Sequence, residues 1–185
     1  TVVCGGTVDF NVGGSYLTWF NVLGGSPFVA AGLRIFPNAV ASLNARLTNS
    51  GTIYLGASGF NVLNSGTYTV SLNDQGVLGA TADWSGNVNI VAPSGTATFK
   101  AADINGNPNN ITLSGIITGG GSIAKSGAGS LTLSGANTYT GNTTISGGTL
   151  ASENNSALPK TTGLTIAAGG TFDLAGFNAQ VAGLT

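Results

Sequence analysis

Histidine is absent from this chain, cysteine occurs once, and charged residues supply only 6% of its 185 positions. Without histidine the chain can form no Ser-His-Asp triad and offers no imidazole ligand to a metal ion. The lone cysteine, Cys4, excludes an internal disulfide and leaves either a free thiol or a bond to another chain. A net charge of −1 with five scattered basic residues provides no patch that would bind nucleic acid.

Long apolar runs are missing as well. No stretch of 18 consecutive apolar residues occurs, so the sequence predicts no membrane-spanning helix. Glycine interrupts nearly every apolar run before the run reaches the length of a helix. The apolar residues are therefore expected in short strands rather than in helices.

Small and polar residues dominate what is present. Gly accounts for 31 residues, and Gly, Ser, Thr and Asn together supply about half of the chain. Such a composition can indicate disorder, because few apolar side chains remain to offset the entropy of the chain. Here hydrophobic residues still reach 42% and recur at short intervals. This combination favours many short β-strands joined by tight turns.

Internal repeats are the strongest signal in the sequence. Thr-Leu-Ser-Gly occurs at 112–115 and again at 132–135. Gly-Gly-Thr occurs at 147–149 and again, at a slightly larger offset, at 169–171. A period of about 20 residues, built from β-branched triplets separated by Gly and Asn, is typical of a solenoid.

We therefore predict an all-β fold in which residues 1–185 form a single parallel β-helix (β-solenoid), with rungs of about 20–22 residues. Each rung would carry short strands that cannot bury their inward face alone, so stacking of the rungs closes the core. Thr and Ser would face outward, and Gly and Asn would turn the corners. Two inward ladders are expected: Ile123, Ile145 and Ile166 in one, and Leu131, Leu150 and Phe172 in the other.

Residues 15–47 break this pattern. They are richer in aromatic residues and contain Pro27 and Pro37, and residues 39–47 can form either a short helix or a bent strand. One interpretation is an irregular rung or a cap that covers an open end of the core. The other is a contact surface for a neighbouring subunit, because exposed aromatic side chains mark interfaces.

The repeat itself is similar to a known one. Residues 125–141 (KSGAGSLTLSGANTYTG), followed by 143–150 (TTISGGTL), resemble the autotransporter-associated β-strand repeat, also called the passenger-associated transport repeat. Segments 82–87 and 110–115 resemble those that often precede this repeat, and the resemblance is best over residues 80–175. The family occurs in large secreted or surface proteins of bacteria. The resemblance implies a right-handed parallel β-helix located outside the cell or at the bacterial cell surface.

The acidic residues form no recognisable catalytic pattern. A polysaccharide-degrading β-helix enzyme would need at least two carboxylates on neighbouring rungs. Asp9 and Asp173 occupy equivalent positions of their rungs but lie at opposite ends of the chain. That placement is incompatible with the separation of roughly 5–10 Å that paired carboxylates need in glycosidases. We predict no enzymatic activity and no cofactor.

Residues 103–110 (DINGNPNN) alternate Asp and Asn in the manner of a calcium-binding loop. The EF-hand pattern requires Gly at position six and an acidic residue at position twelve, where this chain has Pro108 and Ser114. A turn between strands, with Asn105-Gly106 at its tip, is the better interpretation. No metal site is predicted.

The prediction for function is a non-enzymatic extracellular structural β-solenoid, a segment of an adhesin, stalk or self-assembling surface fibre. A β-helix exposes unpaired backbone groups at its two ends, so we expect end-to-end stacking with other copies of the same repeat. The alternative is a module of a passenger domain that binds cell-surface or matrix glycans through aligned aromatic residues such as Trp19, Tyr54, Tyr68 and Trp84. Candidate assembly residues are Trp19, Phe20, Phe28, Phe36, Val181 and Leu184, with Cys4 as a candidate intermolecular thiol.

Overall fold

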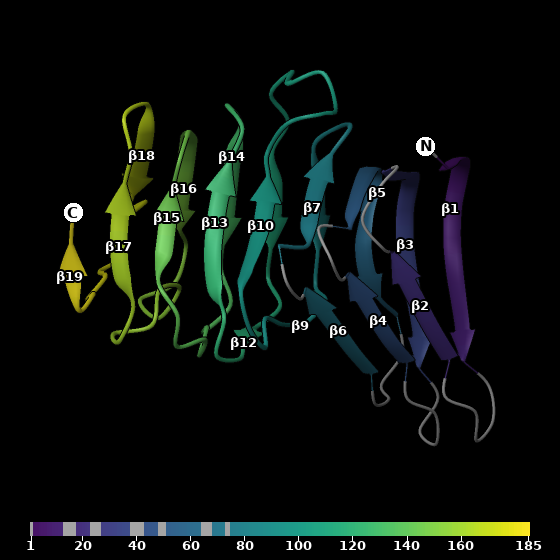
Figure 1. Cartoon of the computed structure of the whole chain (residues 1–185), viewed down its shortest axis with the longest axis horizontal. Coiled ribbons are helices and arrows are strands. Elements are labelled where there is room, and N and C mark those ends of the chain that lie inside the picture. The colour runs from purple at the N-terminus through teal and green to yellow at the C-terminus, as the bar shows by residue number, and fades with distance from the viewer. Residues whose placement is uncertain are drawn as a thin grey trace.

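The structure is a computed structural model that describes residues 2–12, 18–22, 27–37, 43–47, 51–63, 68–72 and 75–185. The described residues form β-strands and turns and contain no helix. Every pair of named strands is parallel, and successive rungs lie side by side along the long axis of the molecule (Figure 1). The predicted all-β parallel solenoid is confirmed.

The strands form three stacks. The first stack consists of the first halves of β1 (Val2–Val12), β3 (Phe28–Pro37) and β5 (Thr52–Val62), then β7 (Val77–Ala80), β10 (Thr96–Lys100), β13 (Ser122–Ser126), β15 (Thr143–Ile145), β17 (Gly163–Ile166) and β19 (Gly183–Leu184). The second stack consists of the second halves of β1, β3 and β5, then β8 (Trp84–Gly86), β11 (Ile111–Leu113), β14 (Ser130–Leu133), β16 (Gly148–Ser152) and β18 (Gly170–Asp173). The third stack consists of β2 (Thr18–Val22), β4 (Leu43–Leu47), β6 (Tyr68–Leu72), β9 (Ile90–Val91) and β12 (Ile117–Thr118).

The length of a rung changes along the chain. Ile53 pairs with Phe28 on the preceding rung, whereas Leu150 pairs with Leu131 and Phe172 pairs with Leu150. More residues lie between the two members of the first pair than between those of the other two pairs. The predicted rung length therefore applies to the C-terminal part of the chain, and the N-terminal rungs are longer. Extra residues are accommodated in corner loops, such as the one between β10 and β11 that projects beyond its neighbours (Figure 1). A longer corner leaves the strand register intact.

The core ladders differ from the prediction in one case. Leu131, Leu150 and Phe172 lie in register on β14, β16 and β18. The other predicted ladder was wrong by two residues, because Ile123 pairs with Thr143 and it is Lys125 that pairs with Ile145. Ile145 does pair with Ile166. A shift of two residues keeps a side chain on the same face of a strand, so Ile123 and Ile145 are still buried.

The described parts of residues 15–47 include three strands within the stacks, β2, β3 and β4, and the pairing of β3 with β5 has a register shift between Ala30 and Gly32. β3 lies between β1 and β5, and β4 lies between β2 and β6. Residues 43–47 are thus a strand and not part of a helix, while residues 38–42 lie outside the described residues. β3 and β4 thus have neighbouring strands on both sides, and the interpretations of residues 15–47 as a cap or as an interface stay predictions.

Asparagine side chains connect neighbouring rungs and explain why this residue is so abundant. Asn137 is only 4% exposed; its Oδ1 accepts a hydrogen bond of 2.7 Å from the backbone N–H of Ile117, and its Nδ2 donates one of 2.7 Å to the carbonyl of Ala157. Asn87 exchanges two hydrogen bonds with the backbone of Val62 in the same way. At the corners, amide side chains thus satisfy backbone groups that no strand pairing reaches.

Replacing Asn137 with alanine is expected to lower the free energy of unfolding by about 2–4 kcal/mol, because a buried N–H and a buried carbonyl both lose their partner. Urea denaturation of wild-type protein and variant measures the loss. The control is Asn105→Ala in an exposed turn, where a change within about 0.5 kcal/mol is expected. Equal stability of the two variants would contradict this role of Asn137.

Candidate functional site

The acidic residues do not converge. The side chains described by the structure include no group of three or more His, Cys, Asp or Glu residues that could hold a metal ion. Asp173 lies on β18, and the backbone of Asp9 lies on β1 at the opposite end of the stack (Figure 1). The positions predicted to be equivalent are therefore separated by most of the length of the solenoid.

The loop after β10 is closed by Asp103 itself. Its Oδ1 accepts hydrogen bonds of 2.8 Å from the backbone N–H groups of Asn105 and Asn107, and its Oδ2 accepts one of 2.8 Å from Nδ2 of Asn107. The side-chain bond from Asn107, followed by the backbone bonds, lowers the pKa of this carboxyl. Gly106 adopts a positive φ of 90° at the tip. Both carboxylate oxygens therefore accept hydrogen bonds from residues of the turn itself.

A buried lysine occupies a core position on β13. Lys125 is fully buried, and its ladder neighbours Phe99 and Ile145 are apolar. Its Nζ donates to the carbonyls of Ser126, Gly127 and Gly147 at 3.1, 2.8 and 2.8 Å. Burial lowers the pKa of the ammonium group to about 8. The only sequence signal for this placement is alternation with Ile123, which puts Lys125 on the inward face.

A second buried polar group is a chain of hydroxyls. The Tyr139 hydroxyl lies 2.6 Å from Oγ1 of Thr143, which lies 3.0 Å from Oγ1 of Thr162, and this last hydroxyl donates to the carbonyl of Gly141 at 2.8 Å. Burial raises the pKa of Tyr139 to about 12. Each hydroxyl has a hydrogen-bond partner, and the bond between Thr143 and Thr162 connects two successive rungs.

The C-terminal end of the stack carries an apolar cavity of about 350 Å³. β18 and β19 are the edge strands of the long sheet at this end, each paired on one side. Leu184 is 66% exposed and Leu174 is 43% exposed. The lining residues are Leu164, Ile166, Phe172, Leu174, Ala179, Val181 and Leu184.

The predicted assembly residues fall into two groups. Val181 and Leu184 lie together at this C-terminal end, and Phe28 lies on β3 far from it; Val181 and Phe28 are both partly buried against the core. The backbones of Cys4, Trp19, Phe20 and Phe36 belong to β1, β2 and β3, but their side chains lie outside the described residues.

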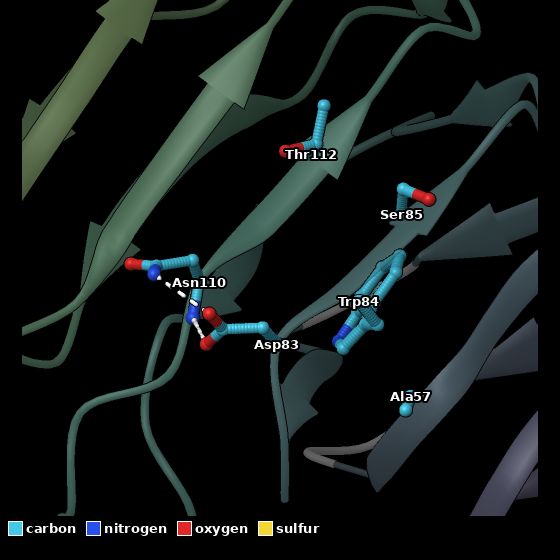
Figure 2. A pocket seen from close by; sticks show the side chains of 6 residues that line it. All are labelled: Ala57, Asp83, Trp84, Ser85, Asn110 and Thr112. Carbon is cyan, nitrogen blue, oxygen red and sulfur yellow. Dashed lines mark hydrogen bonds between the residues drawn. The ribbon is translucent and has the colours of Figure 1, made fainter.

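A polar depression of about 310 Å³ lies on the outer side of β8 and β11 (Figure 2). Asp83 accepts two hydrogen bonds from Asn110, 2.7 Å from its backbone N–H and 3.0 Å from its Nδ2. Trp84 is 4% exposed, and its indole N–H donates to the carbonyl of Gly79. Tyr54 is also buried, so neither Tyr54 nor Trp84 forms the exposed aromatic platform expected of the glycan-binding alternative. The depression is lined by Ala57, Asp83, Trp84, Ser85, Asn110 and Thr112.

Comparison with known proteins finds a family match for one segment of the chain. Residues 123–151 match the family model of the passenger-associated-transport-repeat, which spans nearly all of β13 to β16. No curated protein and no solved structure matches the chain. Among the described residues, no helix is long and apolar enough to cross a membrane. The repeat and the β-solenoid fit a structural domain of the autotransporter passenger type.

Proposed function

We propose that this chain is a non-enzymatic structural segment of a secreted or surface-exposed bacterial protein, and that it extends by end-to-end stacking with a second copy. The observation that carries the stacking is the apolar C-terminal end, where an open cavity and two edge strands lie together. The match to a passenger-associated repeat supports the extracellular location.

A second copy fits this end because all of the paired strands run in the same direction. β1, at the other end of the stack, pairs in parallel with β3 through both of its halves. Among the described strands β1 pairs with β3 alone, and its other edge has the polarity and the two-sided form of a rung that follows β18 and β19. Such a rung would cover Leu174 and Leu184 and would pair the backbone groups of the edge strands, which are otherwise a template for association.

The test is the oligomeric state of the purified chain. Sedimentation velocity over a hundredfold range of concentration is expected to show growing species, and negative-stain microscopy to show rods of variable length. The double variant Leu174→Lys, Leu184→Lys places two charges at the contact and is expected to weaken association at least tenfold, or about 1.4 kcal/mol.

The matched control is Ile104→Lys, since Ile104 is 51% exposed in the loop between β10 and β11, away from the end. Its association should equal that of the wild-type chain. Monomers at all concentrations, or equal weakening by the control, would overturn the stacking proposal.

A further inference from the structure

We infer that the polar depression on β8 and β11 is a binding site for a saccharide residue, recognised through two neighbouring hydroxyl groups by Asp83. The depression occurs where the form of the rungs changes. β5 is one strand that serves two stacks, whereas its successor is split into β7 and β8 at residues 81–83. Ala57 and Ser85, both exposed, have side chains too short to fill the space left at this step (Figure 2).

The polar groups of the depression are held in place before any ligand arrives. Asn110 donates twice to Asp83, while its Oδ1 accepts a hydrogen bond of 2.9 Å from the backbone N–H of Ser130. The backbone N–H of Trp84 donates in turn to the carbonyl of Asn110. Groups fixed in this way lose little conformational freedom on binding, which favours affinity.

The free hydrogen-bonding capacity matches a polyol. Each carboxylate oxygen of Asp83 accepts one hydrogen bond and retains a lone pair, so two vicinal hydroxyls can donate one bond to each. The hydroxyls of Ser85 and Thr112 make no hydrogen bond within the described part of the chain and can both donate and accept. The exposed methyl group of Ala57 supplies an apolar contact for the C–H groups of a sugar ring (Figure 2).

The volume also fits one sugar residue. A depression of about 310 Å³ is at the lower end of the range for small-molecule sites, and its open mouth lets a chain continue from the bound unit. A single hexose in such a site is expected to bind with a dissociation constant in the millimolar range, roughly 1–10 mM. An oligosaccharide and a free monosaccharide share this chemistry, and the experiment separates them.

The experiment is an NMR titration of the ¹⁵N-labelled chain. The probes are methyl α-mannopyranoside, methyl β-galactopyranoside and methyl β-N-acetylglucosaminide, the corresponding tetrasaccharides, and cyclohexanol as a ligand with one hydroxyl. With at least one sugar, saturating shifts are expected at the amides of Ser85, Asn110 and Thr112. Tighter binding of a tetrasaccharide than of its monomer would assign the site to glycan chains, and equal binding to free sugars.

A matched pair of variants tests the assignment. Thr112→Val removes from the depression a hydroxyl that makes no hydrogen bond to any described residue, and is expected to weaken sugar binding at least fivefold without altering stability. Thr132→Val makes the same change one rung further along, outside the depression, and should bind as the wild type does. Shifts that do not saturate, equal shifts with cyclohexanol, or no shifts with any sugar would overturn the inference. None of these outcomes bears on end-to-end stacking.

Discussion

Lys125→Glu is expected to lower the free energy of unfolding by about 5 kcal/mol or to prevent folding, because it buries an unpaired charge in the core. In the native chain the ammonium group lies among three carbonyl oxygens, of Ser126, Gly127 and Gly147. A carboxylate at this position would face three acceptors and find no donor. Circular dichroism and urea denaturation measure the outcome, and a variant as stable as the wild type would contradict the buried position of Lys125.

The same residue is expected to make stability depend on pH. Its pKa is lowered from 10.5 in the unfolded chain to about 8 in the folded one by burial. Between these values the unfolded chain binds more protons than the folded chain, so stability rises with pH. From pH 8 to pH 10 the contribution of Lys125 is expected to increase by about 2–3 kcal/mol. The neutral amine still donates to two of its three carbonyls.

The control for this pH dependence is Lys125→Met, which keeps the length of the side chain and cannot titrate. Its stability should be flat over the same interval. The interval ends at pH 10 because the raised pKa of Tyr139, about 12, acts in the opposite direction at higher pH. There the unfolded chain loses its phenolic proton first, which lowers stability. An unchanged slope in Lys125→Met would assign the effect to another group.

Gly119→Ala is expected to destabilise the chain by about 3–5 kcal/mol, through two costs that add. Gly119 has a positive φ of 109°, which side chains of L-residues rarely tolerate. An added Cβ would also lie against the carbonyl oxygen of Ala92 on the preceding rung and 2.6 Å from its carbonyl carbon. Because both contacts are with backbone, the rungs themselves would have to move apart.

Two further glycines separate these costs. Gly106 has a positive φ of 90° but open space around it, so Gly106→Ala is expected to cost only about 1–2 kcal/mol. Gly183 has open space and no positive φ, and Gly183→Ala should be neutral within about 0.5 kcal/mol. Urea denaturation of the three variants gives the comparison. A loss for Gly119→Ala no larger than that for Gly106→Ala would mean that the spacing of the rungs tolerates the added methyl group.

The sequence predicted the register of one ladder and missed the other by two residues, for a physical reason. Leu131, Leu150 and Phe172 each follow a Gly-containing corner at a similar distance. An alignment of the sequence repeats therefore pairs the same residues as the strands do. Ile123 and Ile145 also align as letters, but their strands pair at a shorter offset, which places Thr143 beside Ile123. Rung lengths vary because the corners differ in length independently of one another. A single repeat length read from the sequence is an average and hides these differences.

The sequence by itself determined the fold class. Few charges, no long apolar run and a short internal repeat leave stacked short strands as the arrangement that can bury the apolar residues. Only the tertiary structure decided which side chains meet across rungs. It placed Lys125 opposite Ile145, joined Asp83 to Asn110 on the next rung, and gathered Val181 and Leu184 at one end. These contacts depend on corner lengths and strand register, which are set by packing between rungs and are not encoded in any one repeat.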